Sequence, residues 1–282
     1  MTVYLNGAFM PLAEARIPVL DRGFIFGDGV YEFVPVYSRK PFRIREHLRR
    51  LQASLDSIRL VNPLELEVWC VRIETLIAAQ EFDDQAVYIQ ITRGVAPRDS
   101  AFPELTAPTI FMMSNPLLTP GADIKAAGVC AITAVDNRWL RCDIKAVSLL
   151  PNVLLRQQAV DANCAEAILL REGFLSEGTA SNIFVVQAGV LLAPPKSNLM
   201  LPGITYDVVL ELAATHGVPH QVRPISEVEL RAADEIWMTS SPKEVLAIVQ
   251  LDGQAVGNGS PGPLALQMDA LYQQYKARVM RQ

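Results

Sequence analysis

Residues 138–150 read RWLRCDIKAVSLL and place a single lysine, Lys145, among apolar neighbours. Ile144 precedes the lysine and an Ala-Val pair follows it, so the stretch predicts a buried strand. A charged amine is costly to bury, and burial favours the neutral form, which is a nucleophile toward carbonyl groups. From the residues alone two interpretations stay open. Lys145 either reaches solvent or pairs with Asp143, or it forms a Schiff base with an aldehyde.

The composition is that of a folded globular protein. The chain has 282 residues, of which 50% are hydrophobic and 20% charged, and its formal charge is −5. The negative charge argues against nucleic-acid binding, and no run approaches the roughly 20 apolar residues of a membrane span. The start, MTVYLNG, lacks a basic segment followed by an apolar core, so we expect no secretion signal and a cytoplasmic location. The three histidines and four scattered cysteines give no metal-ligand spacing, so we expect no metal.

The first part of the chain predicts a small α+β domain. The stretches TVYL and AFMPL flank Asn6-Gly7, which is typical of a hairpin, and VYEFVPVYS with RKPFRI predicts a second one. Apolar residues at three- and four-residue steps predict helices over 46–60 and 64–79. The strands AVYIQITR and TIFMMS complete this domain.

Turn-forming residues in NPLLTPG, at 115–121, predict a linker. We therefore expect an N-terminal α+β domain over 1–115, a linker over 116–121 and a larger C-terminal α/β domain over 122–282 that carries Lys145. The elements expected in the second domain are a strand at 124–134, a helix at 153–163, the strands EAILL, SNIFVVQ and EIWMTS, and helices from Ile204 and Pro263.

An aldehyde cofactor such as pyridoxal phosphate makes three demands besides the lysine. Its phosphate needs amides at a helix start with hydroxyl or arginine donors, its pyridine nitrogen needs a carboxylate, and an amino-acid substrate needs a cationic trap. The candidates are the amides of Ile204 and Thr205 after Pro202-Gly203, the hydroxyls of Thr239–Ser241, Arg50, Glu177 in LSEGTASNIF, and Arg98 in RGVAPRDSAFPE. Each alone has an ordinary structural explanation, such as a turn or a solvated helix face. Their coincidence favours the cofactor.

Five stretches together resemble the fold-type IV pyridoxal-phosphate enzymes, and most closely the branch that transaminates D-amino acids. They are DRGFIFGDGVYE (21–32), ITRGVAPRDSAFPE (91–104), RWLRCDIKAVSLL, SEGTASNIF and LPGIT. The first and the last two are typical of the whole superfamily, whereas Tyr31, the APR loop and RWLRCDIK are more specific to the D-amino acid branch. The resemblance implies a mixed α/β, two-domain fold with the cofactor in the interdomain cleft, and a homodimer.

The resemblance also implies a role for each cofactor residue. Lys145 would bind the cofactor covalently and shuttle the substrate's α-proton, while Glu177 would face the pyridine nitrogen and Leu201 would pack on the ring. The phosphate would be held by Arg50, the amides of Ile204 and Thr205, and the hydroxyls of Ser240 and Ser241.

The substrate carboxylate would be bound by Tyr31 and by Arg98, the latter delivered by the neighbouring subunit. Ser100 stands where the family commonly has a histidine. The loss of an imidazole donor predicts a weaker carboxylate trap, by about tenfold or more in binding, which the Ser100 hydroxyl offsets in part.

The sequence thus predicts a pyridoxal-phosphate D-amino acid transaminase acting on small amino acids and 2-oxo acids, with no nucleic-acid or membrane partner. Two alternatives keep the cofactor: a branched-chain L-amino acid transaminase, and a lyase similar to aminodeoxychorismate lyase. A third alternative is a non-catalytic binder of a phosphate ligand that kept the pocket. The preferred amino acid and the pathway do not follow from the sequence.

Overall fold

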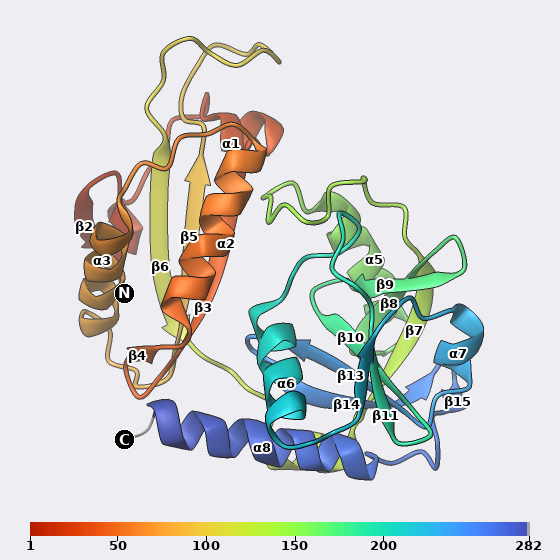
Figure 1. Ribbon diagram of the computed structural model, residues 1–282. Helices are drawn as coiled ribbons and strands as arrows, with labels where there is room; N and C mark the ends of the chain where they lie inside the picture. The colour runs from red at the N-terminus through yellow and green to blue at the C-terminus, as the bar shows by residue number, and fades with distance from the viewer. Residues whose placement is uncertain (281–282) are drawn as a thin grey trace. The chain divides into compact units, whose positions relative to one another are not determined.

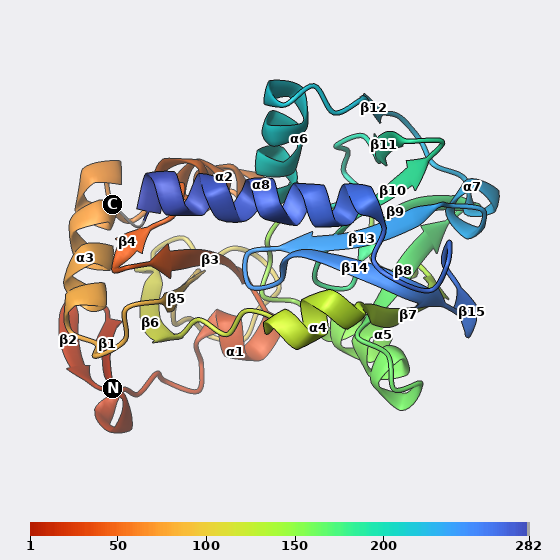
Figure 2. The ribbon, with the colours of Figure 1, turned by 90° about the horizontal axis from the view of Figure 1, so that it is seen from below.

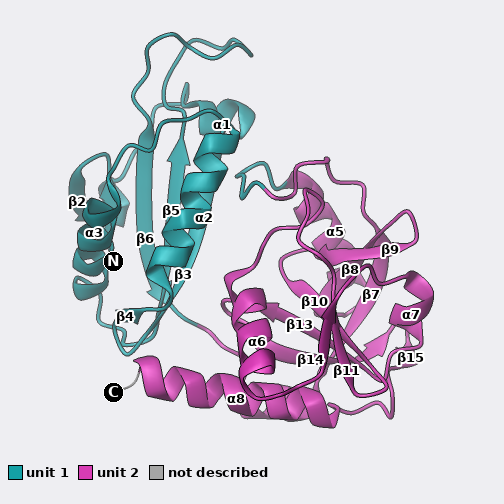
Figure 3. Cartoon of the chain, in the orientation of Figure 1, with its two compact units in different colours: residues 1–117, 144–149, 281 teal, residues 118–143, 150–280, 282 magenta. Residues whose placement is uncertain are grey.

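The computed structural model describes residues 1–280, which form two compact units (Figure 3). Unit 1 contains residues 1–117 and 144–149, and unit 2 contains residues 118–143 and 150–280. The first crossing between the units falls within the stretch expected to be a linker. The segment that carries Lys145 differs from the expected division, because it packs with unit 1 instead of the C-terminal residues around it.

Unit 1 is built on a six-stranded sheet in the order β2-β1-β6-β5-β3-β4, with antiparallel pairing throughout (Figure 1). Its elements are β1 (Thr2–Leu5), β2 (Ala8–Pro11), a 3-10 helix (Leu12–Glu14), α1 (Arg22–Phe26), β3 (Gly29–Tyr37), β4 (Lys40–Pro41), α2 (Ile44–Ser57), α3 (Leu66–Ala78), β5 (Gln85–Thr92) and β6 (Thr109–Pro116). Both predicted hairpins, both helices and both later strands are confirmed.

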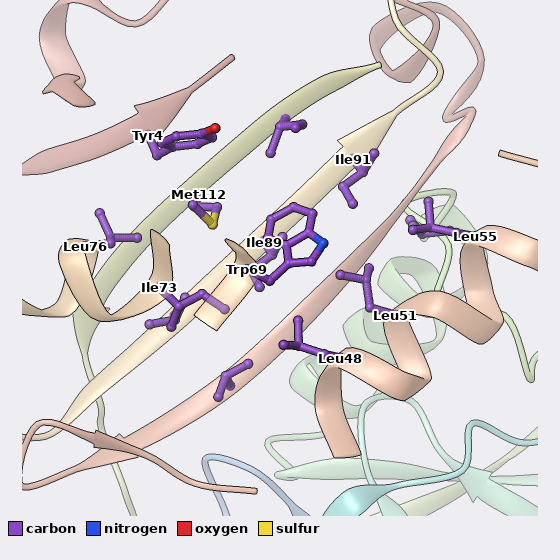
Figure 4. Close-up of a cluster of buried hydrophobic side chains, with 14 of the residues drawn as sticks. Tyr4, Leu48, Leu51, Leu55, Trp69, Ile73, Leu76, Ile89, Ile91 and Met112 are labelled. Atoms are coloured by element: carbon purple, nitrogen blue, oxygen red, sulfur yellow. The ribbon is translucent and has the colours of Figure 1, made fainter. Parts of the chain in front are cut away.

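The core of unit 1 lies between the sheet and helices α2 and α3 (Figure 4). Leu48, Leu51 and Leu55 recur at three- and four-residue steps and so share the buried face of α2. Ile89 and Ile91 alternate along β5 and point from the sheet toward the same cluster. Side chains at the intervening positions of the strands are therefore left for the opposite face of the sheet.

The segment 144–149 is not the regular strand that the sequence predicts. It runs antiparallel beside the start of β3, joined by an isolated bridge between Ala146 and Val30. The amide of Tyr31 donates to the Lys145 carbonyl at 2.9 Å, and the amide of Val147 donates to the Gly29 carbonyl at 3.0 Å. A short pairing of this kind fixes the direction of successive side chains without meeting the length of a strand.

Unit 2 contains a nine-stranded mixed sheet in the order β12-β11-β10-β13-β14-β7-β8-β9, with β15 paired to β14. Its elements are α4 (Ala122–Ala127), β7 (Val129–Val135), α5 (Leu150–Asp161), β8 (Glu166–Arg171), β9 (Phe174–Gly178), β10 (Asn182–Gln187), β11 (Val190–Ala193), α6 (Ile204–Thr215), β12 (His220–Val222), α7 (Glu227–Arg231), β13 (Glu235–Ser240), β14 (Glu244–Leu251), β15 (Gln254–Ala255) and α8 (Pro263–Met280). Helix α8 lies along β13 and β14 (Figure 2).

Two local expectations for unit 2 are wrong. The strand expected at 124–134 begins only at Val129, because residues 122–127 form α4 and the chain turns at Gly128, whose φ is +70°. The sequence predicts Glu177 in a turn, but this residue lies inside β9, and the turn itself follows at residues 179–181. The helix from Ile204, the strands at 166, 182 and 235, and the terminal helix are confirmed.

Candidate active site

Lys145 is the buried lysine that the sequence predicts, with 9% of its surface exposed. Its neighbours Ile144 and Ala146 belong to the apolar core of unit 1, so the alternation along this extended segment turns Lys145 to the opposite side. There its Nζ lies 4.2 Å from the centre of the Tyr31 ring. Asp143, the alternative partner considered for Lys145, pairs with Arg141 at 3.0 Å. The lysine and one predicted substrate residue are therefore neighbours in unit 1.

Arg50 of α2 takes part in a buried cluster with Glu32 and His47. Its Nε donates to Glu32 Oε2 at 3.0 Å and its Nη2 to Oε1 at 2.5 Å, while His47 Nδ1 lies 3.0 Å from the same Oε1. Burial alone would raise the pKa of Glu32, but the Arg50 charge and the His47 contact outweigh it and hold that pKa below its usual range. Burial lowers the pKa of His47, and the charges of Arg50 and Lys145 lower it further. Glu32 is thus ionised and orients Arg50.

The predicted carboxylate-binding residues of the connection between β5 and β6 lie at its surface. Arg98 and Ser100 are both exposed, and the Arg98 guanidinium lies 5.4 Å from the ring centre of Phe26. Their position on an irregular segment separates them from the rigid elements that hold Lys145 and Arg50.

Glu177 in β9 is a buried carboxylate with several donors. Arg138 Nη1 donates to its Oε1 at 2.7 Å, and the amide of Leu201 donates to its Oε2 at 3.0 Å. Asn182 Nδ2 lies 3.4 Å from Oε2 and donates to the Leu201 carbonyl at 3.0 Å. Despite these contacts, burial raises the pKa of Glu177 to about 7. A buried acid that ionises in the neutral range is suited to a cationic N–H partner.

Arg138 gives only part of its charge to Glu177. Its Nε and Nη2 donate to Asp136 at 2.9 and 3.0 Å, and Arg171 lies 3.0 Å from the same carboxylate. Ser176 Oγ also donates to Asp136 at 3.0 Å. Because burial opposes it and the two arginines outweigh that effect, the pKa of Asp136 is lowered. The carboxylate of Asp136 therefore fixes Arg138, and Arg138 fixes Glu177.

The start of α6 has the geometry of an anion site. Gly203 is the N-cap and supplies no side-chain cap, so no capping side chain occupies the first-turn amides of Ile204 and Thr205. A Cβ on Gly203 would lie 2.0 Å from Asn182 Oδ1, so only glycine fits between this turn and the side chain that contacts Glu177. The helix start and the carboxylate are thus held to one another inside unit 2.

The hydroxyl cluster Thr239–Ser241 lies at the end of β13, next to the same elements. Thr239 pairs with Asn182 across the sheet, and its Oγ1 donates to the Asn182 carbonyl at 3.4 Å. Ser240 is the last residue of β13 and accepts a hydrogen bond from the Lys243 amide at 3.3 Å. Unit 2 therefore brings the hydroxyls, the α6 amides and Glu177 close together, as a phosphate and a protonated ring nitrogen in one cofactor require.

Among residues 1–280, no cluster of three or more histidine, cysteine, aspartate or glutamate side chains is placed to hold a metal ion. Within the same range, no helix is both long enough and apolar enough to cross a membrane.

A family model described as amino-transferase class IV matches residues 29–251. The chain belongs to the class IV aminotransferases. The predicted family and the mixed α/β fold with two sheets are confirmed.

This aminotransferase is similar to two curated D-alanine aminotransferases. It is 38% identical to that of Bacillus licheniformis over 264 residues, which cover 94% of this chain and 93% of the relative. It is 35% identical to that of Staphylococcus aureus (strain MW2) over 273 residues, which cover 97% of both.

Solved branched-chain amino acid aminotransferases share the fold of this aminotransferase. The Escherichia coli structure superposes with a TM-score of 0.91 at 25% identity and covers 97% of this chain and 93% of that one. The T.th. structure with pyridoxamine 5'-phosphate has a TM-score of 0.90 at 27% identity, with the same coverage. The fold is therefore common to two substrate classes.

Sequence reasoning missed several residues of the aminotransferase site. Arg138 stands at the head of the quoted stretch that carries Lys145, and Asn182 lies within SNIF. Glu32 lies in the apolar run VYEFVPVY, where a lone charge gives the same signal as Lys145. The sequence carries the signal for Glu32, whereas the partners of Arg138 and Asn182 are distant in sequence and emerge only from the fold.

The raised pKa of Glu177 predicts a pH-dependent stability of the cofactor-free aminotransferase. Because the pKa is about 7 in the folded chain and 4.5 in its ordinary state, the folded chain binds an extra proton between these values. The free energy of unfolding that Glu177 contributes therefore falls as pH rises through this window. We expect the melting temperature of Glu177→Gln, relative to wild type, to increase from about pH 5 to about pH 8.

Thermal melts of the two proteins across this range measure the difference. The matched control is Glu172→Gln, a change at an exposed glutamate in the turn between β8 and β9. A Glu177→Gln difference that stays flat with pH would contradict the prediction.

Proposed function

We propose that this aminotransferase moves the amino group between D-amino acids, such as D-alanine, and 2-oxo acids, such as 2-oxoglutarate, with pyridoxal 5'-phosphate as its cofactor. The observation that carries the chemistry is the buried Lys145 beside Tyr31. The choice of D-amino acids is supported by the curated relatives, which are 35–38% identical, against 25–28% for the branched-chain structures.

The residues of unit 2 fit the cofactor by their chemistry. The uncapped amides of Ile204 and Thr205 and the hydroxyls of Ser240 and Ser241 would hold its phosphate. The carboxylate of Glu177, buried and ionising in the neutral range, would bind a ring N–H. These donors and this acceptor are the set that the group requires.

When bound, pyridoxal phosphate supplies an aldehyde that captures amines and a protonated ring that withdraws electrons from the bound substrate. Glu177 keeps a proton on the ring nitrogen, and Arg138 keeps Glu177 in place. The apolar side chain of Leu201 packs on the ring, and Arg50, oriented by Glu32, adds a cation for the phosphate.

Lys145 is the general base and acid. In its neutral form the amine removes the proton from the α-carbon of the substrate and returns it to the carbon that takes up the amino group. Burial next to Tyr31 keeps water away from the amine, which favours the neutral form. One side chain performs both proton transfers because it stays beside the reacting atoms.

Tyr31, Arg98 and Ser100 bind the substrate carboxylate, with Arg98 and Ser100 presented by the neighbouring subunit of a homodimer. Exposed apolar side chains in and just before the stretch at 21–32 support such a contact with a second copy, since Val19 and Phe24 are 73% and 72% exposed. Ser100 supplies a neutral hydroxyl donor next to the Arg98 guanidinium.

Incubation with D-alanine and 2-oxoglutarate is expected to yield D-glutamate and pyruvate, whereas L-leucine as amino donor yields little glutamate. Chiral chromatography of the products separates the alternatives. A branched-chain transaminase would prefer L-leucine and form L-glutamate. A lyase would leave 2-oxoglutarate unchanged, as would a non-catalytic binder, and either result would overturn the proposal.

A further inference from the structure

The loop that carries Arg98 has no secondary structure of its own over most of residues 93–108, between β5 and β6. Its base is held by the Arg22 amide, which donates to the Gly94 carbonyl at 2.8 Å, and by Thr106 Oγ1, which donates to the Val95 carbonyl at 3.2 Å. The tip with Arg98 lies beyond these contacts. A long irregular loop needs further attachments if its side chains are to be presented in one orientation.

Asp28 holds two arginines that reach this loop. Arg93 binds it in a bidentate way, with Nε–Oδ2 at 2.8 Å and Nη2–Oδ1 at 3.0 Å, and Arg22 Nε donates to Oδ2 at 2.7 Å. Both arginine side chains are at least 95% buried. Burial opposes ionisation of Asp28, but the two arginines outweigh it and lower its pKa. The three side chains form a rigid, charged group under the loop.

One of the two arginines stacks on the loop and the other binds its backbone. The Arg93 guanidinium lies 3.8 Å from the ring centre of Phe102, and its plane is fixed by a further bond from Nη2 to the Ile58 carbonyl at 2.8 Å. Arg22 Nη1 donates to the Asp99 carbonyl at 2.5 Å. These two attachments lie on either side of Ser100, and Asp99 directly follows Arg98.

Phe102 remains 48% exposed although it is a large aromatic side chain. Arg59 lies 5.5 Å from the same ring centre, so two cations lie near the ring. A ring held over a desolvated guanidinium gains cation–π attraction and loses mobility. The exposed half of the ring is accordingly compatible with a defined position.

We propose that Phe102 is a positioning residue, which locks the tip of the loop onto Arg93 and thereby presents Arg98 to the substrate carboxylate. This inference rests on the proposed function of Arg98 in substrate binding. It assigns to the stretch RDSAF a division of labour, in which Arg98 contacts the substrate and Phe102 fixes the loop.

Phe102→Ala in the cofactor-loaded enzyme is expected to raise the KM for D-alanine by about threefold to thirtyfold, the range of one cation–π contact, while kcat changes by less than about twofold. Phe102→Tyr keeps the ring and is expected to restore the wild-type KM. The matched control is Phe82→Ala, a change at a 41% exposed phenylalanine before the opposite end of β5, which leaves KM unchanged. A wild-type KM in Phe102→Ala overturns the inference, as does a loss confined to kcat.

A double-mutant cycle with Arg98→Ala separates this inference from the proposed function. If Phe102 acts through Arg98, Phe102→Ala changes KM little once Arg98 is already alanine. Additive effects would overturn the positioning role and leave the role of Arg98 intact. If Arg98→Ala alone leaves KM unchanged, the proposed function of Arg98 itself fails.

Discussion

Lys145→Ala is expected to reduce transamination of D-alanine by about 10⁴-fold or more and to abolish covalent attachment of pyridoxal phosphate. The expectation follows from the position of the amine, which is buried and lies 4.2 Å from the Tyr31 ring centre. An alanine leaves no group in that place to bind the aldehyde or to move the α-proton.

Two measurements check this prediction. A single-turnover assay follows conversion of the bound cofactor by D-alanine, and borohydride reduction followed by peptide mass analysis locates the covalent adduct. The wild-type adduct should map to the peptide with Lys145. Lys40→Ala, at an exposed lysine of the same unit, is the matched control and should keep both signals. An adduct that survives in Lys145→Ala would contradict the mechanism.

Glu177→Gln is expected to slow the same half-reaction by about 10²- to 10³-fold while covalent attachment at Lys145 persists. Glutamine is close to glutamate in shape and can still accept from Arg138 and from the Leu201 amide, so the local fold is retained. What it loses is the negative charge that keeps a proton on the ring nitrogen. The electron-withdrawing power of the ring falls, and proton removal by Lys145 slows.

Stopped-flow absorbance of the loaded enzyme mixed with D-alanine measures the change. Glu172→Gln in the adjacent turn should react at the wild-type rate. An unchanged rate in Glu177→Gln would show that Glu177 is not the partner of the ring nitrogen, and loss of the Lys145 adduct would show that its role is structural.

Much of the fold could be predicted because its signals are local. The hairpin around Asn6-Gly7 and the helix with Leu48, Leu51 and Leu55 follow from turn chemistry and from apolar spacing within a few residues. The strand expected at 124–134 is wrong for a related reason. Its first residues are apolar enough for either state, and only the reversal at Gly128 separates α4 from β7.

The candidate site could be predicted only where a residue type is unusual in its surroundings. Lys145 in an apolar stretch is such a case, and its burial is confirmed. The expected strand around it is wrong because its pairing with β3 is limited to a few residues, a matter of tertiary contact. The links from Asp136 through Arg138 to Glu177 join distant parts of the sequence, so no local pattern specifies them.

The course of the chain around residues 144–149 has a consequence for how the protein assembles during synthesis. Residues 1–117 are complete long before this segment emerges, yet Ile144 and Ala146 belong to their apolar cluster, and Val147 supplies a hydrogen bond at the edge of β3. A nascent chain that stops at residue 117 therefore has an unfinished core and an open edge. The reactive lysine arrives with the very residues that close it, so maturation of the amino-terminal unit and delivery of its nucleophile are a single folding event.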